Sequence, residues 1–175
     1  MIAVEKEKTK RIFGAKEMTI CALFIALTYV ATAFINIRLP IQANGGLIHL
    51  GNVPLFVAAI IFGKRTGAIA GGLGMAMFDL LSGWVSWAPF TLIIVGLMGY
   101  VSGLVTEKKK NFGHMLFAFI LAVLIKIAGY YMAEGIIYGN WIVPLTSIPG
   151  NIIQVTAGAV ISLPIIAALR KIIRY

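Results

Sequence analysis

The sequence is organised as six apolar stretches separated by short segments that carry most of its charges. The stretches cover residues 18–36, 47–62, 67–83, 89–105, 115–138 and 147–169. Each is close to the length at which a helix crosses the roughly 30 Å of hydrocarbon in a bilayer. A spanning segment must satisfy its own backbone hydrogen bonds, and the alternating pattern of membrane barrels does not occur. The sequence therefore predicts an all-α integral membrane protein with six transmembrane helices.

Composition supports a membrane protein over a soluble one. Of the 175 residues, 60% are hydrophobic and 12% are charged, whereas soluble domains are about half apolar and about a quarter charged. The net charge of +9 is spread in clusters between the apolar stretches rather than along one face, so nucleic-acid binding is not expected. We expect a basic cytoplasmic segment at residues 1–17, followed by a single six-helix membrane domain over residues 18–175.

The positions of the basic residues predict the orientation. With six crossings and a cytoplasmic N-terminus, 13 of the 15 Lys and Arg residues fall on the cytoplasmic side. Arg38 is then on the outer side and Lys126 lies within a span. This distribution satisfies the positive-inside rule. It predicts a multi-pass membrane protein with both termini in the cytoplasm.

Small residues recur at spacings of four in three of the stretches. The third contains Gly67 and Gly71, the fourth contains Gly99 and Gly103, and the first contains Ala22-Leu-Phe-Ile-Ala26. Small residues allow membrane helices to approach closely. We expect packing within the bundle for the third and fourth stretches. For the first, packing within the chain and contact with another subunit remain equal alternatives.

Three charged residues, Asp79, Lys126 and Glu134, lie within the predicted spans. Charges in the membrane are costly and commonly functional. At 1.5 Å per residue, Asp79 and Lys126 are each about 18 Å from the cytoplasmic ends of their helices, so an ion pair between them is possible. It would act either as a structural clamp or as part of a ligand site.

Other polar and aromatic residues are expected in the outer half of the same bundle. Lys126, Tyr130 and Glu134 share one face of the fifth helix, because they are four residues apart. The proposed substrate-binding set is His49, Asn52, Asp79, Trp84, Trp87, Lys126, Tyr130, Glu134, Asn151 and Gln154. Aromatic faces with a few hydrogen-bonding groups suit a small planar polar ligand. The loop 37–46, rich in glycine and polar residues, has the composition of a lid.

The sequence lacks the motifs of common catalytic and metal sites. It contains no H-E-x-x-H, no G-x-S-x-G and no acidic metal cluster. Its one cysteine, Cys21, lies in an apolar stretch. Residues 63–66 (GKRT) lack the spacing of a phosphate-binding loop. We therefore expect no metal, no cofactor and no enzymatic activity. The chain would then be a binding protein that depends on a partner protein for energy.

Several segments resemble those of the substrate-binding S components of energy-coupling factor (ECF) vitamin transporters. They are residues 46–52 (GLIHLGN), 63–67 (GKRTG), 71–74 (GGLG), 78–83 (FDLLSG) and 87–94 (WAPFTLII). The chain is most similar to the riboflavin-type branch, which includes binders of hydroxymethylpyrimidine and related precursors. The local matches concentrate in residues 46–103, and length and span number agree over nearly the whole chain.

The resemblance implies a vitamin-binding subunit that docks on a transmembrane coupling protein (EcfT), which is driven by two ATPase subunits (EcfA and EcfA′). Family members dock through an Ala-x-x-x-Ala surface on the first helix, which Ala22 and Ala26 match. The expected substrate is a small heteroaromatic such as hydroxymethylpyrimidine or a B6 vitamer. Riboflavin and pantothenate are alternatives, as are a small membrane enzyme and a channel or structural membrane protein from different functional classes.

Overall fold

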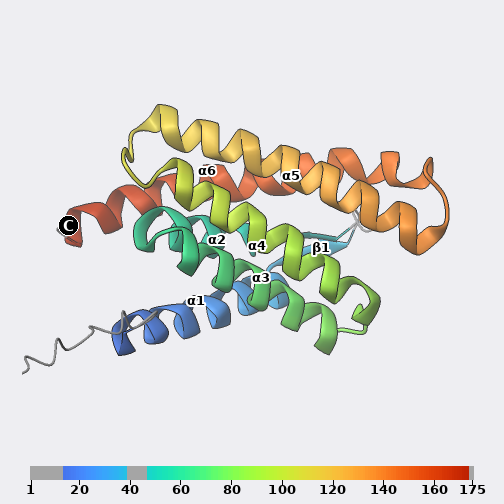
Figure 1. Cartoon of the computed structure of the whole chain (residues 1–175), viewed down its shortest axis with the longest axis horizontal. Coiled ribbons are helices and arrows are strands. Elements are labelled where there is room, and N and C mark those ends of the chain that lie inside the picture. Colours follow the sequence, from blue (N-terminus) through green and yellow to red (C-terminus); the bar gives the residue numbers. More distant parts are fainter. Residues whose placement is uncertain (1–13, 39–46, 174–175) are drawn as a thin grey trace, which may run out of the picture.

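A computed structural model describes residues 14–38 and 47–173 of the chain. Its long helices lie side by side along the longest axis of the molecule (Figure 1). They are α1 (Ala15–Phe34), α3 (Lys64–Leu81), α4 (Ala88–Val105), α5 (Phe112–Tyr138) and α6 (Ile148–Ile172). Shorter elements are α2 (Asn52–Val57), η2 (Ala58–Phe62), η3 (Val85–Trp87) and η4 (Val143–Ser147). The all-helical character of the predicted membrane domain is confirmed.

Four segments within the described ranges are long and apolar enough to cross a membrane. They are Ala15–Phe34, Val85–Val105, Phe112–Tyr138 and Val143–Ile172. Helix α3 has 18 residues, about 27 Å at 1.5 Å per residue, but it contains Lys64, Arg65 and Asp79. The α2–η2 segment has 11 residues, Asn52–Phe62, and reaches only about 16 Å.

The second predicted span begins differently from the prediction. Residues Leu47–His49 form strand β2, which pairs antiparallel with β1 (Asn36–Arg38). The register sets Asn36 opposite His49. Helix α2 starts only at Asn52, so the predicted helical stretch 47–62 was wrong at its N-terminal end. Most of the loop expected to form a lid, including Pro40, Gln42 and Asn44, lies outside the described residues.

The short α2–η2 segment is the centre of the core. Leu55, Phe56, Ala58 and Ile60 are fully buried, and α1, α3, α4 and α6 pack around the segment. It ends at Gly63, whose φ of +99° is strained for residues with a side chain. This glycine lets the chain reverse directly into α3. This buried segment therefore anchors strand β2, which directly precedes it in the chain, to the bundle.

Helices α3 and α4 approach closely through the predicted glycines. A Cβ on Gly67 would lie 2.9 Å from the carbonyl oxygen of Gly99, and a Cβ on Gly103 would meet the backbone of Lys64. These glycines therefore pack within the bundle, as predicted. In α1, by contrast, Ala22 and Ala26 are exposed, whereas Cys21, Phe24, Thr28 and Thr32 are buried on its other face.

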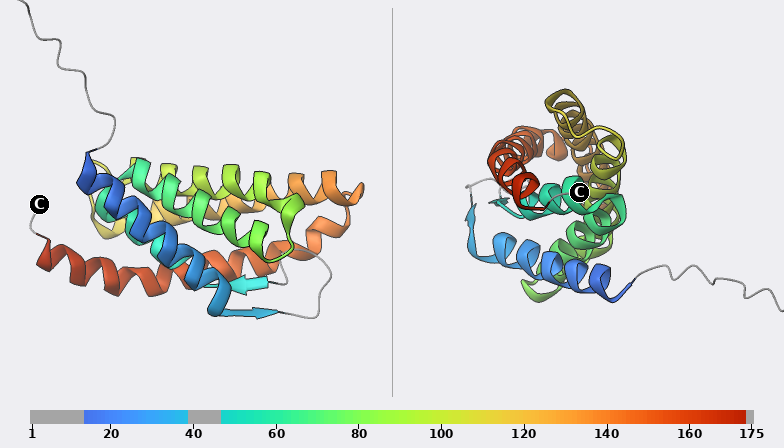
Figure 2. Two further views of the ribbon diagram at one scale, coloured as in Figure 1. Left: turned by 90° about the horizontal axis from the view of Figure 1, so that it is seen from below. Right: turned by 90° about the vertical axis from the view of Figure 1, so that its left-hand side faces the viewer.

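The two ends of the bundle differ in their chemistry. The start of α1, the α4–α5 connection and the end of α6 lie at one end (Figure 2), where the basic residues gather. The β1–β2 hairpin and the α5–α6 connection lie toward the other end (Figures 1 and 2). We call these the basic end and the hairpin end.

Candidate functional site

A cavity toward the hairpin end gathers most of the predicted binding residues. Its free volume is about 20 Å³, which is close to the space needed by one water molecule. It is lined by Thr32, Leu47, His49, Met75, Phe78, Asp79, Trp84, Thr91, Lys126, Tyr130, Asn151 and Gln154. These residues come from α1, β2 and the four long helices α3 to α6, with Trp84 in the α3–η3 turn. The cavity therefore closes where the whole bundle converges.

Lys126 and Gln154 form the central polar contact of the cavity. Lys126 Nζ donates to Gln154 Oε1 at 2.5 Å, and both side chains are buried. The ammonium also lies 5.4 Å from the ring centroid of Tyr130, one turn further along α5, where a cation is attracted to the ring face. The contact joins α5 to α6 across the cavity.

Two further hydrogen bonds fix the walls. The hydroxyl oxygens of Thr91 and Tyr130 are 3.1 Å apart, which joins α4 to α5. Asn52 donates through Nδ2 to the backbone oxygen of Gln154 at 3.4 Å. Asn52 is therefore not a lining residue, but it holds the backbone of α6 beside the cavity.

Buried polar atoms at the cavity retain unused hydrogen-bonding capacity. Asp79 Oδ2 and Gln154 Nε2 have no partner among the described residues. A buried polar atom without a partner costs on the order of 1–3 kcal/mol. Asp79 and Lys126, both within the described part of the chain, form no ion pair. The cavity thus presents a separate carboxylate acceptor and an amide donor.

Aromatic rings form the side of the cavity next to η3. Trp84 lines it, and Trp87 packs behind it with its ring centroid 6.4 Å from that of Trp84 and 6.3 Å from that of Tyr130. Arg38, from β1, lies over the Trp84 ring at 5.1 Å. Trp87 is buried and does not itself line the cavity. It packs against the rings of Trp84 and Tyr130, which do.

His49 closes the cavity from the hairpin. Its Nδ1 accepts a hydrogen bond from the backbone N–H of Gly51 at 3.3 Å, which leaves Nε2 to carry the proton of the neutral ring. Burial, together with the positive charge of Lys126, lowers the pKa of His49 well below its ordinary value. His49 is therefore a neutral imidazole at pH 7.

Glu134 is separate from the cavity lining. It is fully buried, and its Oε2 accepts a hydrogen bond from Ser147 Oγ at 2.7 Å. This bond ties α5 to the start of α6, one turn before Asn151. The described residues contain no group of three or more His, Cys, Asp or Glu side chains suited to a metal ion.

Comparison with known proteins identifies the family. A family model described as ECF-type riboflavin transporter, S component, matches residues 13–171. The chain belongs to this family. This S component is 34% identical over 147 residues to the thiamine precursor transporter HmpT of Lactococcus lactis subsp. cremoris, an alignment covering 84% of this chain and 83% of the relative. It is also 34% identical over 103 residues to an uncharacterized protein of Pyrococcus woesei, covering 59% and 69% of the two chains.

A solved structure supports the fold. The S component of a bacterial ECF transporter, from a study of its structure and mechanism, matches with a TM-score of 0.70 at 18% identity, covering 91% of this chain and 98% of that one. The family resemblance in the sequence is thereby confirmed, as is a multi-pass membrane protein. Because the family consists of transporter subunits, this S component is not in itself an enzyme.

The structure adds lining residues of the S component that sequence reasoning missed. Thr32 and Thr91 are buried polar residues in otherwise apolar helices, and that contrast could have revealed them. Leu47, Met75 and Phe78 also line the cavity, but apolar residues in an apolar helix carry no such signal. Seven of the predicted residues line it as well: His49, Asp79, Trp84, Lys126, Tyr130, Asn151 and Gln154.

Proposed function

We propose that this S component binds a thiamine precursor, a small aminopyrimidine of the hydroxymethylpyrimidine type, in the cavity at the hairpin end. The sequence identity of 34% to a thiamine precursor transporter supports this choice of substrate. The observation that carries the proposal is the pair of unpartnered buried atoms, Asp79 Oδ2 and Gln154 Nε2. The alternatives within the same function are a B6 vitamer, riboflavin and pantothenate.

The hydrogen-bonding groups complement an aminopyrimidine. Such a ring carries an exocyclic amine, which donates, beside a ring nitrogen, which accepts. The Asp79 carboxylate can accept from the amine, and the Gln154 amide can donate to the ring nitrogen. Trp84 and Tyr130, which line the cavity, offer faces for an aromatic ring. Binding would thus satisfy polar atoms that are costly to leave unpaired.

The size of the cavity favours a single ring. With a free volume of about 20 Å³, any vitamin must displace part of the wall. The wall formed by the hairpin is a short two-stranded sheet, with three paired positions between β1 and β2. A one-ring substrate requires a smaller displacement than the three fused rings and sugar-like chain of riboflavin. Pantothenate has no ring to stack against Trp84.

The substrate is tested with the purified protein in detergent. Thermal shift and calorimetric titration are measured for hydroxymethylpyrimidine, pyridoxal, riboflavin and pantothenate, with mass spectrometry of any co-purified molecule. We expect tight binding of hydroxymethylpyrimidine, weakened by Asp79→Asn and unaffected by Asn140→Asp in the α5–α6 connection. Tight binding of riboflavin or pantothenate alone would contradict the proposed substrate, and retention of none of the four would contradict the binding function.

We also propose six membrane crossings with both termini in the cytoplasm. The basic end carries Lys16, Lys64, Lys108 and Arg170, in agreement with the positive-inside rule, and the cavity then opens toward the outside. The α2–η2 segment is too short to span by itself, and the hairpin would connect it to the outer surface. Single cysteines at Lys109 and Asn140 in a Cys21→Ser background test this orientation. Only the cysteine at 140 should react with an impermeant maleimide in intact cells, and the reverse result would invert the topology.

Ala22 and Ala26 are proposed as the docking surface for EcfT, which the ATPases EcfA and EcfA′ would drive. Both side chains are exposed, so their close spacing is available to another helix. Ala26→Trp should reduce uptake at least about tenfold, equivalent to about 1.4 kcal/mol of docking energy, while substrate binding in detergent is unchanged. Ala128→Trp, at an exposed position of α5, is the matched control. Equal uptake by the two variants would reject this surface.

A further inference from the structure

A second cleft lies at the basic end, between the α4–α5 connection and the end of α6. Its volume is about 350 Å³. It is lined by Ile61, Glu107, Lys108, Lys110, Arg170 and Ile173. Three cationic side chains therefore share one concave surface with two isoleucines, far along the bundle from the substrate cavity.

The cations of the cleft are positioned by the backbone. Arg170 donates through a guanidinium nitrogen to the carbonyl oxygen of Lys110 at 2.5 Å. Lys110 Nζ donates to the carbonyl oxygen of Ile61 at 3.3 Å, close to the end of η2. Arg170 has five N–H donors, and this hydrogen bond uses one of them. The other N–H groups of its planar guanidinium can donate to an anion that carries several oxygen atoms.

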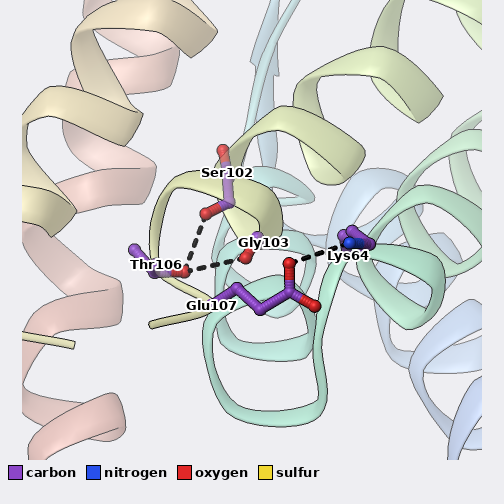
Figure 3. Close-up of polar contacts among 5 residues, drawn as sticks. All are labelled: Lys64, Ser102, Gly103, Thr106 and Glu107. Carbon is purple, nitrogen blue, oxygen red and sulfur yellow. Dashed lines mark hydrogen bonds and ion pairs between the residues drawn. The ribbon is translucent and has the colours of Figure 1, made fainter. Parts of the chain in front are cut away.

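The carboxylate in the cleft does not neutralise these cations. Glu107 Oε2 is 2.8 Å from Lys64 Nζ at the start of α3 (Figure 3), so its charge is already matched by a lysine outside the cleft lining. The other carboxylate of this end within the described residues is Glu17, which accepts from the backbone N–H of Gly14. Burial and the charge of Arg170 lower the pKa of Lys110, as expected where positive charges lie together. Among the described side chains that line the cleft, cations therefore outnumber carboxylates.

We propose that this cleft binds a phosphate group, supplied by the headgroup of an anionic membrane lipid. Lys108, Lys110 and Arg170 surround the space with ammonium and guanidinium donors, the groups that recognise phosphate oxygens. Ile61 and Ile173 provide apolar surface beside them for the start of an acyl chain. Basic pockets between membrane helices at the cytoplasmic side bind anionic headgroups. A soluble phosphate has the same chemistry, and the experiment separates the two sources.

The test compares two double variants with the same change in charge. Lys108→Gln with Arg170→Gln removes two cations that line the cleft, and Lys109→Gln with Lys171→Gln removes their sequence neighbours, which do not line it. Full-length delipidated protein is titrated in detergent with phosphatidylglycerol, phosphatidylcholine or inorganic phosphate. Native mass spectrometry reports adducts, and thermal shift reports stabilisation. The unfolding midpoint without lipid verifies that each variant is folded.

We expect phosphatidylglycerol to bind wild type and the Lys109/Lys171 variant alike. The Lys108/Arg170 variant should bind it at least about tenfold more weakly, because two side chains that can donate charge-assisted hydrogen bonds to the phosphate are replaced by neutral ones. Phosphatidylcholine should bind none of them comparably. Inorganic phosphate acting with the same dependence on the variants, at similar concentrations, would support the site and assign it a soluble anion. Equal losses in both variants, equal binding of the two lipids, or no binding of lipid or phosphate would overturn the proposal.

Discussion

Two lysines, one in the middle of the bundle and one at its basic end, each form one short hydrogen bond, but in different surroundings. Lys126 is 2% exposed and its partner is the neutral amide of Gln154 at 2.5 Å. Lys64 pairs with the carboxylate of Glu107 at 2.8 Å, and the two side chains are 28% and 53% exposed. The buried cation thus has a neutral partner, and the exposed cation has a charged one.

The difference shows that the energetic weight of a contact depends on its surroundings more than on its length. An exposed ion pair is screened by water and contributes little. A buried cation that forms no direct salt bridge remains costly, and it is retained in a membrane protein mainly where it serves function. Lys126 is therefore the stronger candidate for ligand recognition, and Lys64 has a local structural role.

Replacing Lys126 tests this contrast most strongly. Lys126→Met should weaken substrate binding about 10- to 100-fold, because a charged hydrogen bond contributes about 1.5–3 kcal/mol. Its unfolding midpoint should not fall, because the cost of burying the charge is removed as well. Calorimetric titration and thermal unfolding measure the two effects. Lys64→Met is the control and should bind normally, and unchanged affinity in Lys126→Met would remove the lysine from the site.

Replacing Asn151 and Glu134 tests which residues near the cavity contact the substrate. Asn151 lines the cavity, so Asn151→Ala should lower affinity about tenfold, corresponding to about 1.4 kcal/mol. Glu134 contacts Ser147 instead, so Glu134→Gln, which can keep that bond, should change affinity less than about threefold. Titration of the two variants under identical conditions decides. A larger effect at Glu134 would place the substrate closer to the α5–α6 connection.

Acidification tests the cavity end through His49. Burial and Lys126 keep the pKa of His49 below its ordinary value, so the unfolded chain takes up a proton near pH 6.5 that the folded protein does not. The contribution of His49 to the free energy of unfolding should then fall as the pH drops from about 7.5 to 5.5. His49→Gln removes this contribution, so on acidification the unfolding midpoint of wild type should fall relative to that of the variant. Asp79, which lines the same cavity, is the same in both proteins. Identical slopes would show that His49 does not titrate in this way.

The Lys64–Glu107 pair should give the smallest effect. A double-mutant cycle with Lys64→Ala and Glu107→Ala is expected to yield a coupling energy below about 1 kcal/mol, reduced further at high salt. Chemical or thermal unfolding in detergent provides the measurement. A coupling energy above about 2 kcal/mol would remove the contrast between the two lysines.

The features of the fold that follow from composition could be predicted from the sequence. Long apolar stretches identified α1, α4, α5 and α6. Glycine spacing predicted close packing of α3 and α4 within the bundle, but not that they pack against each other. The start of α2 was missed because Leu47–His49 is a short apolar run that suits a helix or a strand. Its pairing with Asn36–Arg38 is a contact between two separate segments of the chain, and local sequence patterns do not predict such a contact.

The candidate site was predictable in kind and less so in detail. Charged and amide residues in apolar helices indicated Asp79, Lys126 and Gln154, because such groups are costly in a membrane unless they are used. Helical spacing placed Glu134 on the face of Lys126, but it could not show that Ser147 comes within hydrogen-bonding distance from the next connection. Nor could it assign Gln154, rather than Asp79, as the partner of Lys126, because that choice depends on the rotation of α6.

Helix α1 reaches both the substrate cavity and the proposed docking surface. Thr32 lines the cavity, Ala22 is exposed two to three turns earlier on the same helix, and the helix leads directly into β1, which is paired with the strand of His49. A tilt of α1 would therefore also move the β1–β2 hairpin, which closes the cavity. If a partner that binds α1 changes its tilt, and a ligand holds the hairpin closed, the two binding events are coupled. By thermodynamic reciprocity, the partner then changes the affinity for the ligand by the same factor as the ligand changes the affinity for the partner.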